Sequence, residues 1–429
     1  MSSASHLSRN TRGLWWHAFW LSASLTFTEF NTVLPSLVLD VGGAEIHIGI
    51  LTGIMIGVPL LAQLGFAGYL HGRPRKKPYL ILGIHVRVFA LAGAALTIGA
   101  AGALSAGPVI LRLYLWMMLF SLSGAFAGIS YTDIAGRAVP SDYRRRFFVL
   151  KQTLSGLGVM AAALLGRLIL GAMDFPQDYR TMFLAAATAL LIATAGFWVL
   201  REPVRRPADT ASANHTPGSA HDAVPQEGPG YWDVMRSIPG ILRTDATLRN
   251  YILASNLLGL GVTLVPFYVA LCRIRVGLTG ADLGTLLLVQ IVAMVTSNLI
   301  WSRVARRGGF KGVLRWLILI AATGPMVALL LSTDALSAAF PLIFLLSGAA
   351  HSADHIASDA VLIEITSDEN RATYSGIFGT LNLTRALFPV ANGALLATIG
   401  YDAVFIAVGI IALFALPLLR GMVCPVDRD

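Results

Sequence analysis

The sequence predicts an all-α integral membrane protein with twelve transmembrane helices in two pseudo-symmetric six-helix bundles. Charged residues are scarce, long apolar stretches repeat along the chain, and one polar interval divides them. Of the 429 residues, 55% are hydrophobic and only 13% are charged, whereas a soluble chain carries about 25% charged residues. Glycine, with 42 residues, is typical of membrane helices that pack closely. The deficit of charge excludes an ordinary soluble enzyme.

Twelve apolar stretches are long enough to cross a bilayer, which takes about 20 residues. They are expected at 14–39, 47–70, 78–103, 108–133, 147–172, 180–200, 248–272, 281–302, 313–333, 338–364, 373–398 and 401–422. An even number of spans places both termini on the same side of the membrane.

A polar interval follows the sixth span. Residues 201–230 are rich in Pro, Ser, Ala and Gly and lack apolar periodicity, which predicts a flexible linker. Residues 231–243 carry apolar side chains at helical spacing between basic ones, which predicts a short helix in the membrane interface. The expected organisation is an N-tail (1–13), an N-terminal bundle (14–200), a linker with its interfacial helix (201–247), a C-terminal bundle (248–422) and a C-tail (423–429).

The basic residues predict the orientation. Most of the 32 Lys and Arg lie in segments on the side of the N-tail, and only Arg180, Arg273 and Arg275 lie in loops on the other side. Because loops rich in Lys and Arg stay in the cytoplasm, both termini are expected there, with the protein in the cell (inner) membrane. The net charge of +9 is thereby explained by topology and contact with membrane lipids, so we expect no nucleic-acid partner.

The two halves share a pattern at a fixed offset. "DIAGRAVPSDYRRR" (133–146) follows the fourth span and "DAVLIEITSDENRA" (359–372) follows the tenth. Asp133, Asp142 and Arg145 correspond to Asp359, Asp368 and Arg371. A repeat between corresponding spans indicates an internal duplication, as in transporters built from two bundles.

The loop after the second span, "GYLHGRPRKK" (68–77), resembles the G-x-L-a-D-R-x-G-R-K signature of the major facilitator superfamily. The matching residues are Gly68, Leu70, Arg73, Lys76 as a like charge, and Lys77. The signature's Asp is Gly72 here, and its second Gly is Arg75. A weaker copy, "SRVARRGGFK" (302–311), follows the eighth span, with Arg307 matching and Arg306 at the acidic position.

The resemblance implies a transporter fold in which this loop helps to lock one half against the other. It implies gating roles for Gly68, Arg73, Lys76, Lys77, Arg145, Arg307 and Arg371. In the family the signature's Asp contributes to the ion pairs that lock the halves. Since neither loop here holds that carboxylate, we expect a different latch, with Asp142 or Asp368 as candidates.

A polar stripe lies on the tenth span, in "GAAHSADHIASDAVLIEI" (348–365). At about 100° per residue, Asp354, His355 and Ser358 lie within about 60° of His351, with Asp359 slightly farther round the helix. Three interpretations stay open. The stripe is a solvated cavity wall, a proton-coupling site, or a Zn, Fe or Mn site in which His351, Asp354 and His355 supply three ligands.

Arg385 lies midway along the eleventh span, with Asn382 one turn earlier. A midplane arginine either pairs with a carboxylate or binds an anionic substrate. The simplest expectation is an ion pair with Asp354 or Asp359 on the preceding span, and direct substrate binding is the alternative.

Glu29 is the leading proton-carrier candidate of the first half. Ser22, Thr26 and Thr32 share its face of the first span, which predicts a polar wall along an aqueous path. A plain hydrogen-bonded or hydrated carboxyl is the alternative. His85, Arg87, Arg112 and Arg167 also lie within spans, and we expect them to reach toward the headgroups or to pair locally.

The functional hypothesis is a secondary active transporter that moves a small solute or ion by alternating access, coupled to protons. The phosphate-binding sequence G-x-x-x-x-G-K-[ST] is absent from the chain, so an ion gradient or the solute's own gradient supplies the energy. No cofactor is expected besides a coupling proton, and no enzymatic activity. The alternatives are a transition-metal transporter, for instance of iron, and a transporter-like receptor or scaffold that moves nothing.

Overall fold

The computed structural model describes residues 3–71, 73, 75–140, 143–202, 231–366 and 371–422. Within these residues the chain is helical and contains no strand. The first bundle consists of α1 (Ser3–Phe27), α2 (Val33–Asp40), α3 (Glu45–His71), α4 (Lys77–Gly99), η1 (Ala101–Ala103), α5 (Ala106–Ala138), α6 (Arg144–Ala172) and α7 (Gln177–Val199). Of the predicted linker, 201–230, all but the first two residues lie outside the described residues.

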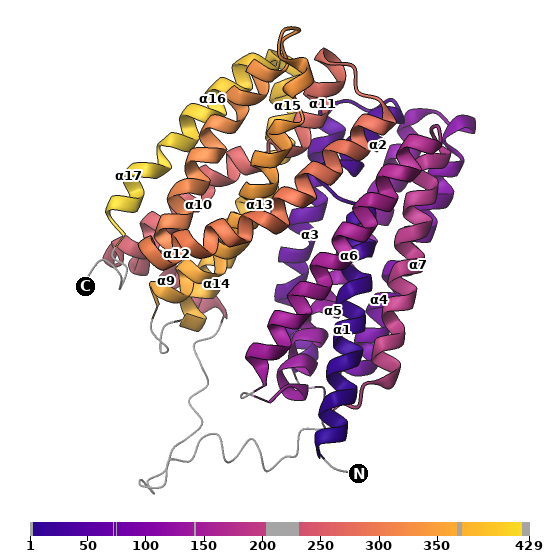
Figure 1. Ribbon diagram of the computed structural model, residues 1–429. Coiled ribbons are helices and arrows are strands. Elements are labelled where there is room, and N and C mark those ends of the chain that lie inside the picture. Colours follow the sequence, from indigo (N-terminus) through magenta and orange to yellow (C-terminus); the bar gives the residue numbers. More distant parts are fainter. Residues whose placement is uncertain are drawn as a thin grey trace, which may run out of the picture.

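The second bundle begins after α9 (Tyr231–Thr244), which occupies the segment predicted as an interfacial helix. It consists of α10 (Ala246–Val262), α11 (Val265–Arg275), α12 (Gly280–Leu331), η2 (Ser337–Ala339), α13 (Leu342–Glu364), α14 (Arg371–Leu381), η3 (Asn382–Ala386), α15 (Phe388–Ile399), α16 (Tyr401–Leu413) and α17 (Ala415–Arg420). Figure 1 shows two helical bundles side by side, in contact at the end opposite the termini and separating toward the termini. We call these the far end and the tail end.

Eight segments of the described chain are long and apolar enough to cross a membrane. One of them, α12, has 52 residues and contains two predicted spans. Gly309 interrupts it with a φ of 62°, a left-handed conformation that glycine adopts without steric cost. The predicted all-α membrane fold is confirmed.

Three other predicted spans are interrupted within the bilayer region. Residues 28–32 separate α1 from α2, residues 263–264 separate α10 from α11, and η3 lies between α14 and α15. Pro266 and Pro389 are the second residues of the helices that follow the second and third breaks. Backbone groups freed at such breaks must find side-chain or water partners, so they occur where a helix lines a cavity.

The bundles pack against each other through glycines. On α3, a Cβ at Gly49 would collide with the carbonyl oxygen of Pro389, and one at Gly53 would lie 2.9 Å from the carbonyl oxygen of Ala386. On α12, a Cβ at Gly284 would lie 2.7 Å from the Cα of Arg167 on α6. Both helix pairs, α3 with η3–α15 and α6 with α12, therefore approach to backbone contact.

Candidate functional site

Three neighbouring cavities lie between the bundles, and His351 and His355 border all of them. We call them the central chamber, the tail-side chamber and the C-bundle chamber. Their volumes are about 500, 770 and 530 Å³, in that order. The central chamber reaches Glu29 on the first bundle, and the tail-side chamber reaches His17 on α1, closer to the tail end. The stripe on α13 thus lies where the three chambers meet.

The two histidines face each other across one helical turn. Their ring centroids are 4.8 Å apart at an interplanar angle of 70°, and His351 also lies 6.2 Å from the ring of Phe30. Neither imidazole has a hydrogen-bond partner among the described residues. Water or a ligand in the chambers therefore has access to their ring nitrogens.

Asp354 pairs with Arg385, and it is one of the two carboxylates expected to be the partner of that arginine. The Nη2 atom of Arg385 lies 3.3 Å from Oδ2 of Asp354, and the two side chains are only 17% and 24% exposed. Ser358 donates a second hydrogen bond to Oδ1 of Asp354, 3.3 Å. Asp359 lies in the same helix, α13, but its side chain is outside the described part of the structure.

Asn382 begins η3, at the break that also positions Arg385. Its side chain is 5% exposed and lines the C-bundle chamber. The Oδ1 atom accepts a hydrogen bond from Asn256, 3.4 Å, while the Nδ2 atom has no partner. The break thus presents a guanidinium and an unsatisfied amide donor to the cavity.

Glu29 lies at the break between α1 and α2. Its carboxylate accepts hydrogen bonds from the backbone N–H and the side chain of Asn31, 2.8 and 2.9 Å, and from the same two groups of Thr32, 2.7 and 2.9 Å. A carboxylate held by four donors at the N-terminus of α2 stabilises that helix. This geometry corresponds to the hydrogen-bonded cavity carboxyl that was the alternative to a proton carrier.

The metal interpretation finds no support in the side chains that the structure describes. Among them, no group of three or more His, Cys, Asp or Glu residues has a geometry that could hold a metal ion. In the structure Asp354 is directed to Arg385, whereas the metal interpretation, one of the three left open, needs it beside His351 and His355.

Two cations that line the chambers were not predicted to do so from the sequence. Arg87, expected to reach the headgroups or to pair locally, instead lines the central chamber, with its guanidinium carbon 4.1 Å from the ring centroid of Phe120. Lys151, at the start of the fifth expected span and not singled out there, lines the tail-side chamber, with Nζ 5.1 Å from the ring centroid of Tyr131. Helical spacing alone does not separate a lipid-facing from a cavity-facing position on these helices.

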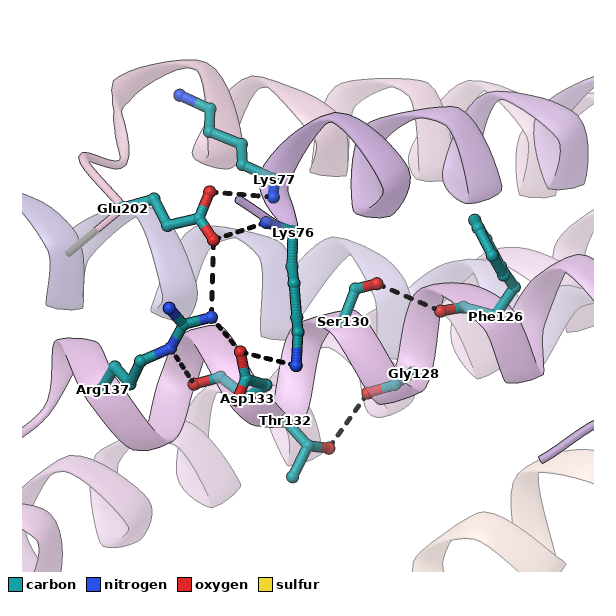
Figure 2. Close-up of polar contacts among 9 residues, drawn as sticks. All are labelled: Lys76, Lys77, Phe126, Gly128, Ser130, Thr132, Asp133, Arg137 and Glu202. Carbon is teal, nitrogen blue, oxygen red and sulfur yellow. Dashed lines mark hydrogen bonds and ion pairs between the residues drawn. The ribbon is translucent and has the colours of Figure 1, made fainter. Parts of the chain in front are cut away.

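Carboxylates of the first bundle hold the start of α4 at the tail end (Figure 2). Glu202 accepts hydrogen bonds from the backbone N–H groups of Lys76, 2.6 Å, and Lys77, 3.0 Å, and lies 3.5 Å from Arg137. Asp133 pairs with Nζ of Lys76 at 3.1 Å and with Arg137. These contacts lie within one bundle, and Glu202 was not among the predicted residues.

Both bundles use a lysine in the same way. Nζ of Lys77 donates to the carbonyl oxygen of Leu200, 2.7 Å, and Nζ of Lys311 donates to that of Met422, 2.8 Å. Each lysine follows the second span of its half and reaches the chain just beyond the last helix of that half. A cation is favourable there because the last carbonyl groups of a helix carry partial negative charge.

The other residues with implied gating roles are scattered at the tail end. Arg73, Arg145 and Arg307 are exposed, and Arg73 lies over the ring of Tyr69 at 4.9 Å. The surroundings of Gly68, the side chain of Arg371 and the latch candidates Asp142 and Asp368 lie outside what the structure describes.

Polar contacts join the two bundles at the far end. Arg273 on α11 pairs with Asp40 of the first bundle, and Asp40 also accepts a hydrogen bond from Tyr179, 2.8 Å. The hydroxyl of Tyr401 donates to Oε1 of Glu45, 3.0 Å. We call Asp40–Arg273 and Glu45–Tyr401 the far-end contacts. The cavity is thus closed at the end where the bundles meet.

Solved transporters share this architecture. A mutant of the nucleoside transporter NupG is similar with a TM-score of 0.70 and 13% identity, over 96% of this chain and 99% of that one. An inward-facing, unoccupied bacterial homolog of the human lysosomal transporter Spinster has a TM-score of 0.64 and 14% identity, over 99% of each chain. An inward-facing bacterial homologue of the iron transporter ferroportin has a TM-score of 0.66 and 14% identity, over 98% of this chain and 99% of that one. Identities this low establish the fold alone.

No curated protein sequence matches this one. The family profile of the Major Facilitator Superfamily, in contrast, matches residues 17–343 and 251–426, which together cover both bundles. With two bundles around a shared cavity and this match along its length, the chain belongs to the Major Facilitator Superfamily and is a membrane-spanning transporter of the solute-transport kind.

Proposed function

We propose that this transporter moves a small solute across the cell membrane by alternating access and that protons drive the movement. The observation that carries the proposal is the position of the three chambers. They lie between the bundles, meet at His351 and His355, and are closed at the far end by contacts between the bundles. Rocking of one bundle against the other would open the far end and expose the same side chains to the opposite side.

The helix breaks support this location for the solute. Glu29 and Phe30 at the first break line the central chamber, and Asn382 and Arg385 at η3 line the C-bundle chamber. Interrupted helices near the bilayer midplane are typical of transporter binding sites because they present polar backbone and side-chain groups to the cavity. One break from each bundle contributes here.

His351 and His355 are the proposed proton carriers. The imidazole is the side chain whose charge ordinarily changes between about pH 5 and 8, and both rings border all three chambers. The ionisable groups that border the same chambers are Asp354 on α13, Arg385 in η3, Glu29 between α1 and α2, Arg87 on α4, Lys151 on α6 and His17 on α1. Both carboxylates already have partners, and Nδ1 of the buried His17 lies 3.4 Å from the carbonyl oxygen of Ala193. The imidazoles of His351 and His355 have no such partner among the described residues and are left to bind protons from the cavity.

The orientation predicted from Lys and Arg completes the proposal. With the tail end in the cytoplasm, a cavity closed at the far end is the inward-facing state, and both termini are cytoplasmic.

The proposal is tested by measuring distances between pairs of spin labels in a cysteine-free background. Gln177 and Asp334 are exposed at the far end, one in each bundle, and Arg145 and Arg307 are exposed at the tail end. Alternating access predicts that one distance lengthens as the other shortens when the pH is changed from 5.5 to 8.5, in lipid nanodiscs. Distances that stay fixed, or that lengthen together, would contradict it.

The proton assignment needs its own variants. The double variant His351→Gln, His355→Gln is expected to lose the pH dependence of both distances. His85→Gln is the matched control, because His85 is exposed on α4 and its Nδ1 donates to the carbonyl oxygen of Ile81 in its own helix, 2.8 Å, away from the three chambers. An unchanged pH response in the double variant would rule out these two histidines as the carriers.

A further inference from the structure

The charges along the chambers are unevenly compensated. Both carboxylates are satisfied: Glu29 by four donors from Asn31 and Thr32, and Asp354 by Arg385 and Ser358. The positive charges of the first bundle are not compensated in this way. Counted formally, Arg87, Lys151 and Arg385 against Glu29 and Asp354 leave the chamber lining with a surplus of one positive charge, and no described carboxylate pairs with Arg87 or Lys151.

Arg87 is the clearest case. Among the described residues no carboxylate pairs with it, and its Nε atom is buried without any hydrogen-bond partner. Its contact in the chamber is the face of Phe120, a cation–π interaction that satisfies none of the five N–H donors. A guanidinium left this way within a membrane protein is costly, and such groups are typical of substrate or ion paths.

The neighbouring helix is built around this guanidinium. A Cβ at Gly124 on α5 would lie 3.3 Å from Nε and 3.4 Å from Cζ of Arg87, closer than most carbon contacts. An alanine at this position would require the guanidinium to shift by a few tenths of an ångström, and a larger side chain would require more. Glycine at 124 thus keeps Arg87 directed along the chamber wall and over Phe120.

A second unpaired cation extends the positive wall toward the tail end. Nζ of Lys151 lies over the rings of Tyr131, 5.1 Å, and Phe148, 5.8 Å, and no described carboxylate pairs with it. Lys151 and His355 both line the tail-side chamber. An anion that leaves Arg87 toward the tail end would meet this second positive charge.

The remainder of the central chamber indicates the body of the ligand. Met55, Ile56, Ile291 and Met294 present apolar surface there, and methionines adapt to ligands of varied shape. One polar atom of this wall, Oε1 of Gln290, is buried without a partner and would accept a hydrogen bond from a ligand. A cavity of about 500 Å³ accommodates a small organic molecule.

We propose that the substrate is a small organic anion, a carboxylate or a phosphate ester, whose charged group binds Arg87 and whose apolar body lies among the methionines. The inference rests on the proposed transport function, because it assigns the substrate of the same cavity. Arg87 fixes the charged group through charge-assisted N–H···O bonds, and Lys151 receives that group on the path toward the tail end.

Binding is measured on the full-length protein in detergent by thermal shift and isothermal titration. Benzoate, phenyl phosphate and neutral benzamide share a ring and differ in the charged group. We expect at least one anion to bind about tenfold or more tightly than benzamide, the factor typical of a buried charge-assisted pair. The order of the two anions distinguishes carboxylate from phosphate. Equal binding of all three compounds would overturn the proposal.

Variants assign the binding to Arg87. Arg87→Gln is expected to abolish the preference for the anion, and Arg87→Lys to retain part of it. Arg112→Gln is the matched control, because Arg112 is exposed on α5, outside the residues that line the three chambers. Should Arg87→Gln fail to fold, Gly124→Val tests the same point. Its Cβ would lie 3.3 Å from Nε of Arg87 and its two methyl groups need further room, so the guanidinium must move and anion binding is expected to weaken while benzamide binding does not. Full anion preference in both foldable variants would refute the role of Arg87.

The two proposals fail separately. Anion binding in detergent requires no movement of the bundles, whereas the spin-label distances require no ligand. Fixed distances with intact anion preference would reject alternating access alone, and opposite distance changes without anion preference would reject the organic anion alone.

Discussion

Replacing Arg273 by Gln tests whether the far-end contacts hold the cavity closed. Arg273 pairs with Asp40 across the bundles, and the two side chains are 34% and 20% exposed. Asp40 would keep its hydrogen bond from Tyr179, 2.8 Å, within the first bundle. The substitution therefore removes a contact between the bundles without leaving a carboxylate unsatisfied inside one of them.

The magnitude follows from this partial exposure. A fully exposed ion pair contributes between about 0 and 1 kcal/mol, and a hydrogen bond to a charged group about 1.5–3 kcal/mol. For a pair that is about one-quarter exposed and retains a second partner on the acid, we expect about 1–1.5 kcal/mol, which is a shift of about five- to twelvefold in the equilibrium between the two states. Tyr401→Phe removes the contact with Glu45, and a further shift of about 1 kcal/mol is expected in the double variant.

The assay is the far-end label pair at Gln177 and Asp334, measured by pulsed electron spin resonance in nanodiscs. Arg273→Gln should increase the fraction of long far-end distances, and the double variant with Tyr401→Phe should increase it further. The tail-end label pair should shorten in the same proportion, because the two ends of a rocking bundle move in opposite directions.

Arg275→Gln is the matched control. Arg275 lies two residues along the same helix and pairs with Asp402 at 2.8 Å, within the second bundle. Its loss should leave both distance distributions unchanged. If Arg273→Gln behaves like Arg275→Gln, the far-end contacts do not hold the closed state and the reasoning is wrong.

Three further outcomes are expected. Glu202→Ala should lower the free energy of unfolding by about 1–2 kcal/mol, seen as a lower midpoint in a thermal scan, because the first N–H groups of α4 lose their acceptor. Glu202→Gln keeps an acceptor oxygen and should lose less. Gly49→Ala should lengthen the far-end distance because its methyl group collides with the backbone of α15, whereas Gly102→Ala, where a Cβ meets nothing within 4 Å, should change nothing. Asp354→Ala should destabilise the protein by about 1–3 kcal/mol, since it leaves the Arg385 guanidinium without its counter-ion. The double variant with Arg385→Ala should recover part of this loss. Additive losses in the thermal scan would show that the two side chains do not interact.

The polar stripe on α13 could largely be predicted from the sequence. Its place on one helix face, its position in the tenth span and the pairing of Asp354 with Arg385 follow from helical periodicity and from the cost of an unpaired charge in the membrane. The helix breaks were not predicted. Residues 28–32 (TEFNT) and 382–387 (NLTRAL) are themselves mostly polar, but the long apolar segments on both sides of each led us to expect one uninterrupted span.

The membrane class and the helix face that carries the polar stripe could be predicted from the sequence, because they depend on residue type and local spacing. The sequence did not predict that Asn31 and Thr32 hold Glu29, that Glu202 holds the start of α4, or that Arg87 faces the cavity without a counter-ion among the described residues. Whether a charged side chain finds a counter-ion or hydrogen-bond partner depends on which helices become its neighbours. Packing between segments distant in the chain determines which helices are neighbours, and local periodicity does not predict that packing.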